Sequence, residues 1–174
     1  MQPNIINQLG PLAVGARIRR FYDTLAKDMT RVYTENGLPL EPKDFILYYL
    51  LSQRDKLSIS DIAKELSLTH PAVIHVAKSL EKMGYVESVK DEEDTRKRYL
   101  KLTKKGRQDV VKYQPLWQNV RLLNNALFVQ HTQFLKTLET LEGLLEQQSF
   151  YQRFHAIQPT KNNTAPKRQK AAKK

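Results

Sequence analysis

The sequence contains no cysteine, which excludes disulfides, cysteine-bound zinc, iron–sulfur clusters and thiol catalysis. It has no run of about 18 apolar residues, so no segment predicts a membrane span. Residues 1–20 lack the charged-then-apolar layout of a signal peptide. Glycine is scarce, and no phosphate-binding loop, His-Glu-x-x-His or Gly-x-Ser-x-Gly motif occurs. We therefore expect a cytoplasmic protein that is not an enzyme and holds no cofactor and no metal.

What the sequence does contain is positive charge. Its 174 residues include 29 Lys and Arg but 18 Asp and Glu, a net charge of +11. Hydrophobic residues make up 40%, enough for an ordinary core. Residues 161–174 hold six cations and no acid, and we predict a disordered basic tail over 159–174. This tail either keeps the protein soluble or attracts nucleic acid without sequence preference.

Apolar residues at helical spacing predict helices at both ends of the chain. One stripe runs from Ile18 to Val32 and stops at Gly37. Another runs from Leu127 to Leu145 in steps of three and four, which predicts one long amphipathic helix. Pro115 lies between them and predicts a kink or break near Tyr113. Because a small lobe cannot cover both stripes, we expect them to pack against a second copy of the chain.

The middle of the chain predicts three helices, with a tight turn between the last two, and then a hairpin. A nearly apolar, buried helix opens at 41–42, and Ser58 precedes Asp61 by three residues, as in a capping box. After a turn in which Ser67 takes a position where glycine is common, Thr69 caps a helix that stops at Gly84. Residues 85–89 and 99–102 then alternate, as strands do. This order is typical of a winged helix-turn-helix.

The hairpin segment also resembles a known family, the multiple-antibiotic-resistance regulators (MarR family) of prokaryotes. Its most specific part is 91–106, Asp-Glu-Glu-Asp-Thr-Arg-Lys-Arg-Tyr-Leu-Lys-Leu-Thr-Lys-Lys-Gly, which looks like the family's acid-rich turn, arginine and Leu-x-Leu-Thr-x-x-Gly signature. Residues 57–66 and 70–73 continue the likeness. The resemblance implies a homodimer that binds double-stranded DNA at a pseudo-palindromic operator and represses or activates transcription. Small phenolic or otherwise amphipathic effectors often control such proteins.

The resemblance also sets the expected layout of the domains. The fold class is mainly α with a small β-hairpin wing, and one MarR-like domain spans 1–158. Within it, the DNA-binding lobe covers about 40–106, and helices at about 10–36 and 107–150 form the dimer. The opening, 9–20, is similar to the branch in which this domain precedes an acetyltransferase. Because the sequence ends at Lys174, we expect no acetyltransferase here.

Helix-turn-helix proteins place the start of their second helix in the major groove. His75 can bond a base edge, Pro71 and Ala72 can touch thymine methyls, and Thr69 and Lys78 suit phosphates. A solvated surface is the plainer interpretation of His70 and His75, and no third ligand accompanies them as a metal site would require. The full set of predicted DNA-binding residues is Ser58, Thr69, His70, Pro71, Ala72, His75, Lys78, Ser79, Arg96, Lys97 and Arg98.

The wing leaves two roles open for Arg96. The resemblance places an arginine of this kind in the minor groove, or beside an aspartate that braces the turn. Glu92 and Glu93 occupy the tip, where many relatives carry a cation, so the depth to which the wing inserts is open. The acidic tip also motivates an alternative function, a winged-helix module that binds proteins. The basic tail motivates another, an architectural protein that binds DNA without specificity.

Aromatic residues are the candidates for an effector pocket. If a pocket exists, the resemblance places it between the dimerisation region and the DNA-binding lobe. The candidates are Tyr22, Tyr48, Tyr49, Tyr113 and Trp117. Aromatic residues at helical spacing also fit a core, and the sequence leaves both interpretations open.

Overall fold

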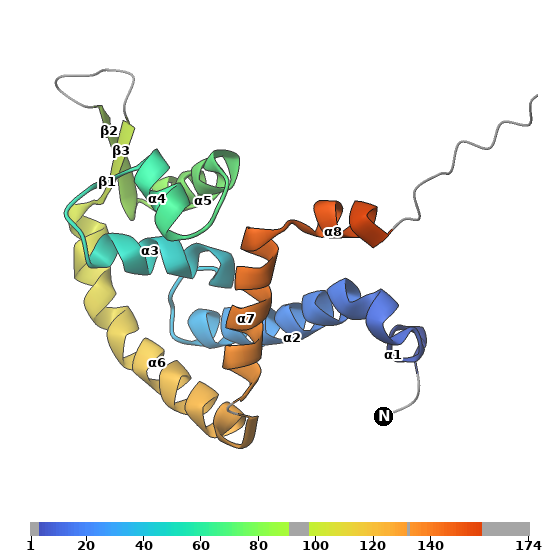
Figure 1. Cartoon of the computed structure of the whole chain (residues 1–174). Coiled ribbons are helices and arrows are strands. Elements are labelled where there is room, and N and C mark those ends of the chain that lie inside the picture. Colours follow the sequence, from blue (N-terminus) through green and yellow to red (C-terminus); the bar gives the residue numbers. More distant parts are fainter. Residues whose placement is uncertain (1–3, 91–97, 132, 158–174) are drawn as a thin grey trace, which may run out of the picture. The chain divides into compact units, whose positions relative to one another are not determined.

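A computed structural model describes residues 4–90, 98–131 and 133–157 of the chain. It is mainly helical with one small sheet, as predicted (Figure 1). Its elements are α1 (Ile5–Gln8), η1 (Gly10–Ala13), α2 (Val14–Glu35), η2 (Pro42–Asp44), α3 (Phe45–Ser52), β1 (Leu57–Ser58), α4 (Ile59–Glu65), α5 (His70–Lys82), β2 (Val86–Lys90), β3 (Arg98–Leu102), α6 (Lys104–Phe128), η3 (Val129–His131), α7 (Gln133–Gln147) and α8 (Phe150–Ile157). The chain divides into two compact units, residues 1–119 and 120–174.

The predicted helix ends of the first unit are confirmed. Ser58 accepts a hydrogen bond from the backbone N–H of Asp61 at 3.1 Å, and Thr69 accepts one from Ala72 at 3.3 Å. Gly84 ends α5 with φ +73°, a conformation that side chains disfavour. Ser67 takes φ +52° in the turn between α4 and α5, which explains why glycine is common at this position.

The sheet has one strand more than predicted. The hairpin of β2 and β3 is confirmed, with Val86 opposite Leu102 and Lys90 opposite Arg98. The two residues of β1 pair with the other edge of β3, which gives the strand order β1-β3-β2 (Figure 1). A strand of two residues is too short to show alternation, so the sequence does not reveal it. Its effect is to tie the wing to the start of α4.

The core of the first unit is built around α3. Leu47, Tyr48 and Leu51 of this helix are buried, as the all-round apolar pattern predicts. They meet Ile62 of α4 and Val73 of α5, which are fully buried. The packing fixes which faces of α4 and α5 remain open.

The joint between the wing and α6 is held by Thr103 and Gly106. The Thr103 hydroxyl donates to the Gly84 carbonyl at 2.6 Å and accepts the N–H of Gly106 at 2.9 Å. The Tyr48 hydroxyl donates to the Gly106 carbonyl at 2.6 Å. A Cβ on Gly106 would overlap the Tyr85 carbonyl oxygen, so only glycine allows this approach. The Leu-x-Leu-Thr-x-x-Gly pattern is thus a packing motif that joins wing, core and helix.

Of the kink or break predicted near Tyr113, the break does not occur. α6 continues through Pro115 from Lys104 to Phe128. Proline removes the hydrogen bond to the carbonyl four residues earlier, here that of Val111. Val111 is 66% exposed, so the turn that lacks this bond lies at the surface, and the fixed φ of proline suits a helix.

The prediction of one helix from Leu127 to Leu145 is also wrong. α6 ends at Phe128, η3 follows, and α7 begins at Gln133. The rings of Phe128 and Phe134 stack across this break at 5.4 Å. No glycine or proline marks it, so hydrophobic periodicity alone cannot show it. α8 was not predicted either.

Candidate nucleic-acid interface

α5 presents an open face that contains most of the predicted reading residues. Its buried side consists of Val73, Ala77 and Leu80. Pro71, His75 and Lys78 lie on the exposed side, and His70 is exposed at the first helical position. Thr69 is also exposed and is engaged as the N-cap, while Ala72 is half-buried. The helix therefore offers a ring donor and acceptor, an ammonium group and apolar carbon along one face.

Sequence reasoning missed one residue of this face and misplaced another. Ile74 is 40% exposed and lies among Pro71, His75 and Lys78, as its spacing from Pro71 and Lys78 already allowed. Ser79 is half-buried, and its hydroxyl donates to Asp44 of η2 at 2.9 Å. Ser79 therefore lies away from the exposed face, because its spacing also brings it towards η2.

An open groove lies where α4, α5 and the wing meet. Its volume is about 490 Å³, and it is lined by Ser58, Ile59, Ser60, Asp61, His70, Arg98 and Tyr99. The structure thus brings together three predicted residues from three elements. Ser58 has little hydrogen-bonding capacity left for a ligand. Its hydroxyl donates to the Asp61 carboxylate at 2.6 Å and also caps α4.

Cations stand beside this groove. The Lys56 ammonium lies 4.9 Å from the centroid of the Tyr99 ring, a cation–π contact that sequence reasoning did not anticipate. Arg98 is exposed and donates from Nε to the Ser88 hydroxyl at 3.0 Å, and its terminal guanidinium nitrogens carry four further N–H donors. Among the described lining residues, Asp61 contributes the negative charge and Arg98 a positive one, and Lys56 adds a second positive charge beside Tyr99.

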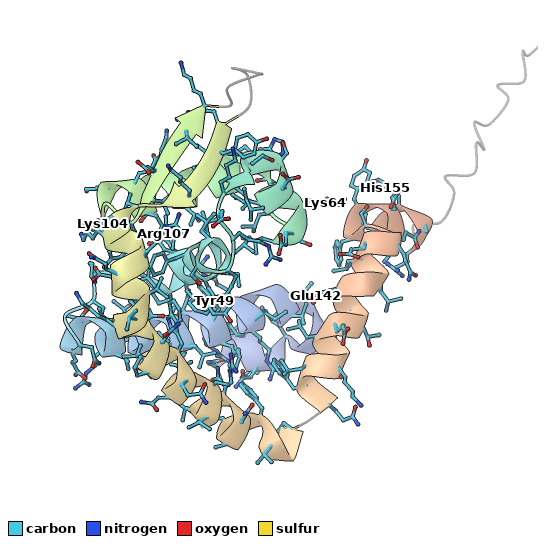
Figure 2. All side chains as sticks on the ribbon, turned by 90° about the vertical axis from the view of Figure 1, so that its left-hand side faces the viewer. Tyr49, Lys64, Lys104, Arg107, Glu142 and His155 are labelled. Carbon is cyan, nitrogen blue, oxygen red and sulfur yellow. The ribbon has the colours of Figure 1, made fainter. Side chains whose placement is uncertain are left out.

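The rest of the wing is partly outside the described residues. Arg96, Lys97, Glu92 and Glu93 lie outside the described residues, and their roles stay predictions. Near the base of the hairpin, Lys101 pairs with Glu87 at 3.3 Å, which weakens its attraction for a phosphate. Lys64 on α4 and Lys104 and Arg107 on the first turns of α6 add positive charge to the surface of this unit (Figure 2).

The aromatic candidates for an effector pocket divide by burial. Tyr48 and Tyr113 are fully buried. The Tyr113 hydroxyl accepts the N–H of Leu40 at 3.2 Å and lies 3.3 Å from the Tyr85 hydroxyl. Burial raises the pKa of Tyr48 and of Tyr113, so both phenols stay neutral. They belong to the core, and Tyr49 and Trp117 pack against each other at its edge, 5.5 Å between rings.

The described residues contain neither a cluster of metal ligands nor a membrane-spanning helix. Among residues 4–90, 98–131 and 133–157, no group of three or more acidic or histidine side chains is placed to hold a metal ion. Within those residues no helix combines the length and the apolar character that crossing a bilayer requires.

The fold and the interface are those of a winged helix-turn-helix protein. Residues 40–97 match the family model of the MarR family. No curated protein matches the chain. The likeness of its opening to the acetyltransferase-linked branch stays a prediction.

Solved structures share this fold. MepR of S. aureus, solved in complex with DNA, has a TM-score of 0.64 and 19% identity, over 76% of this chain and 98% of that one. MOSR of M. tuberculosis, also in complex with DNA, has a TM-score of 0.62 and 19% identity, over 75% and 96%. The heme sensor PefR of Streptococcus agalactiae, in complex with heme, has a TM-score of 0.53 and 20% identity, over 82% and 97%. At these identities the likeness concerns the fold.

Proposed function

We propose that the protein is a transcription regulator that binds double-stranded DNA at specific sequences, as a homodimer in the cytoplasm. The observation that carries this proposal is the open face of α5, which presents His75 and Lys78 beside a groove flanked by Lys56 and Arg98. A helix of this kind reads base edges in the major groove, while the cations beside it contact phosphates. Two structural neighbours were solved with DNA, which agrees with this use of the fold.

Selection of bound sequences from a random DNA pool tests the specificity. A regulator should enrich a motif and prefer it over random DNA by about 10³-fold or more. An architectural protein should bind DNA with a ratio near one. A protein-binding module should bind neither pool, and this result would exclude the proposal.

The groove gives the proposal a residue-level test. Lys56→Ala is expected to reduce the slope of log affinity against log salt by about 0.9, the value of one phosphate contact. It should weaken selected and random DNA by similar factors, because a phosphate carries no sequence information. Affinity titrations at several salt concentrations measure both effects. Lys112→Ala removes the same charge from a side chain paired with Asp109 at 2.6 Å, and should leave the slope nearly unchanged.

Variants of Tyr99 test whether the position of the Lys56 ammonium, and not only its charge, contributes to DNA affinity. Tyr99→Leu removes the ring that holds the ammonium and is expected to lower affinity about twofold to fivefold, from the usual strength of an exposed cation–π contact. Tyr99→Phe keeps the ring and should bind like the parent protein. Equal affinity of the Leu and Phe variants would remove this contact from DNA binding.

The homodimer accounts for apolar surface that each unit leaves open. None of the described residues of α7 and α8 is buried, and Leu138 and Leu141 are 36% and 51% exposed. On α2, Ile18 and Leu25 are 59% and 38% exposed. Apolar surface of this extent marks an interface. A two-fold dimer would place its recognition helices for half-sites about 34–36 Å apart.

We expect analytical ultracentrifugation to find a dimer at micromolar concentration. The double variant Leu138→Glu/Leu141→Glu places two carboxylates in the apolar surface and should yield monomers. Lys136→Glu, on the same helix, changes an exposed cation instead and should remain dimeric. A monomeric parent protein would contradict the proposed assembly.

We also propose that a small amphipathic effector regulates the protein. Heme bound by the structural neighbour PefR supports ligand control on this fold. Because Tyr48 and Tyr113 are core residues, the effector must bind elsewhere. To test this, DNA affinity is measured with and without an amphipathic phenol such as salicylate. We expect the phenol to change the affinity.

A further inference from the structure

Asp44 is a buried acid that the DNA-binding interface does not use directly. It is the last residue of η2 and occupies the N-cap position of α3. Aspartate at this position normally accepts a hydrogen bond from its own helix, but the Asp44 side chain makes no such bond. It is fully buried instead, which is unusual for a carboxylate without a cationic partner.

The side chain of Asp44 is directed at the recognition helix. Its Oδ2 accepts the hydroxyl of Ser79 on α5 at 2.9 Å, while its Oδ1 has no hydrogen-bond partner. Ser79 follows Lys78 directly and lies one turn after His75. The carboxyl therefore links η2 to α5, one residue from the exposed face that we assign to DNA.

Few charges act on this carboxyl. Burial raises the pKa of Asp44, and the hydrogen bond from Ser79 and the charge of Lys43 oppose the shift only in part. Lys43 is paired with Glu41 at 2.8 Å, and Glu41 itself raises the pKa of Asp44. α2, α3 and α5 all pack against η2. The charges with the largest effect on the pKa of Asp44 are nevertheless those of Lys43 and Glu41 beside it.

We propose that Asp44 is a proton-sensitive positioning residue, whose protonation strengthens the packing of the recognition helix and thereby DNA binding. The inference rests on the proposed function, because it takes the packing of α5 seen here as the DNA-binding arrangement. A neutral carboxyl can remain in this dry contact with Ser79. An ionised carboxyl has one oxygen without a donor, and its hydration requires η2 and α5 to separate.

The direction of the pH effect follows from the raised pKa. A carboxyl that holds its proton more tightly in the packed state contributes stability below the pKa of the unfolded chain, and this contribution is lost as pH rises through the pKa of the packed state. The packing of α5 should therefore weaken from about pH 4 upward. Acidification should strengthen it.

The experiment compares the full-length parent protein with Asp44→Asn, which cannot ionise. DNA affinity is measured on the selected motif and on random DNA at intervals from pH 4.5 to pH 7.5, a range that begins just above the ordinary pKa of an aspartate. Histidine protonation contributes equally to both proteins, so the difference between them isolates Asp44. Asp44→Asn should reduce the pH dependence of affinity by about fivefold or more, the lower end of coupling between linked sites.

Hydrogen exchange of the α5 amides, corrected for intrinsic rate at each pH, gives a second readout that needs no DNA. Protection should fall between pH 4.5 and 7.5 in the parent and stay constant in Asp44→Asn. Ser79→Ala removes the donor to the ionised carboxyl, so it should steepen the pH dependence while binding at low pH is kept. Asp109→Asn removes an acid that has a lysine partner and should behave like the parent.

The two readouts separate this inference from the proposed function. If Asp44→Asn shows the same pH dependence as the parent in both, the positioning role is overturned. The same holds if Asp44→Asn and Ser79→Ala shift affinity equally at every pH, as a purely structural role would. If α5 protection depends on pH in the parent alone but no DNA is bound, the coupling of Asp44 to α5 stands and the proposed function falls.

Discussion

Gly106→Ala is expected to destabilise the winged-helix lobe by about 3 kcal/mol or more, the upper range for overpacking a well-packed contact. The new Cβ would overlap the Tyr85 carbonyl oxygen and lie 3.0 Å from the Tyr85 carbonyl carbon. Both obstacles are backbone atoms, so a side-chain rotation cannot relieve them. The strand or α6 must move, and that movement breaks the bonds from Thr103 and Tyr48.

Thermal and urea unfolding followed by circular dichroism measure this loss. Gly15→Ala is the matched control, because nothing lies within 4 Å of the Cβ it adds, and it should change the free energy of unfolding by about 0.5 kcal/mol or less. If Gly106→Ala unfolds at the same midpoint as Gly15→Ala, the close approach of α6 to Tyr85 is not present in solution.

His75→Ala should cost about 1–3 kcal/mol on the selected motif and relax the preference at one base position. The reason is that His75 is exposed on the open face of α5, where its ring can bond a base edge. Lys78→Ala removes a charge from the same face and should instead weaken all sequences to a similar degree. Binding of each variant to the motif and to a set of single-base variants distinguishes the two outcomes.

An unchanged motif and affinity for His75→Ala would show that another face of α5 reads the DNA. Ile74, which lies beside His75, is the next candidate, because an apolar side chain can contact a thymine methyl. Ile74→Ala would then be expected to relax the preference for thymine, with little change in the salt dependence.

Much of the fold could be predicted because its signals are local. The caps at Ser58 and Thr69 and the stop at Gly84 depend on residues within a few positions of each other. The two wrong predictions both concern where a helix ends, which the local signals of glycine and proline did not decide here. The break after Phe128 carries no glycine or proline, and α6 tolerates Pro115 because the carbonyl that loses its partner belongs to an exposed residue.

The candidate site was predicted in part for the same reason. Spacing along one helix places Pro71, His75 and Lys78 on one face, and the structure agrees. Spacing cannot show that Lys56 meets the ring of Tyr99, since the two residues come together only through the pairing of β1 with β3. The same pairing brings Ser58 beside Tyr99, and both residues line the groove.

The sequence by itself determined the winged helix-turn-helix with its caps and turns, because periodicity and capping are properties of neighbouring residues. It also predicted which residues share the open face of α5. Only the tertiary structure decided what the buried polar groups contact. Ser79 bonds Asp44 across 35 positions, and Tyr48 bonds Gly106 across 58. Contacts over such distances depend on how whole elements pack, since each side chain takes the partner that the assembled core brings within reach.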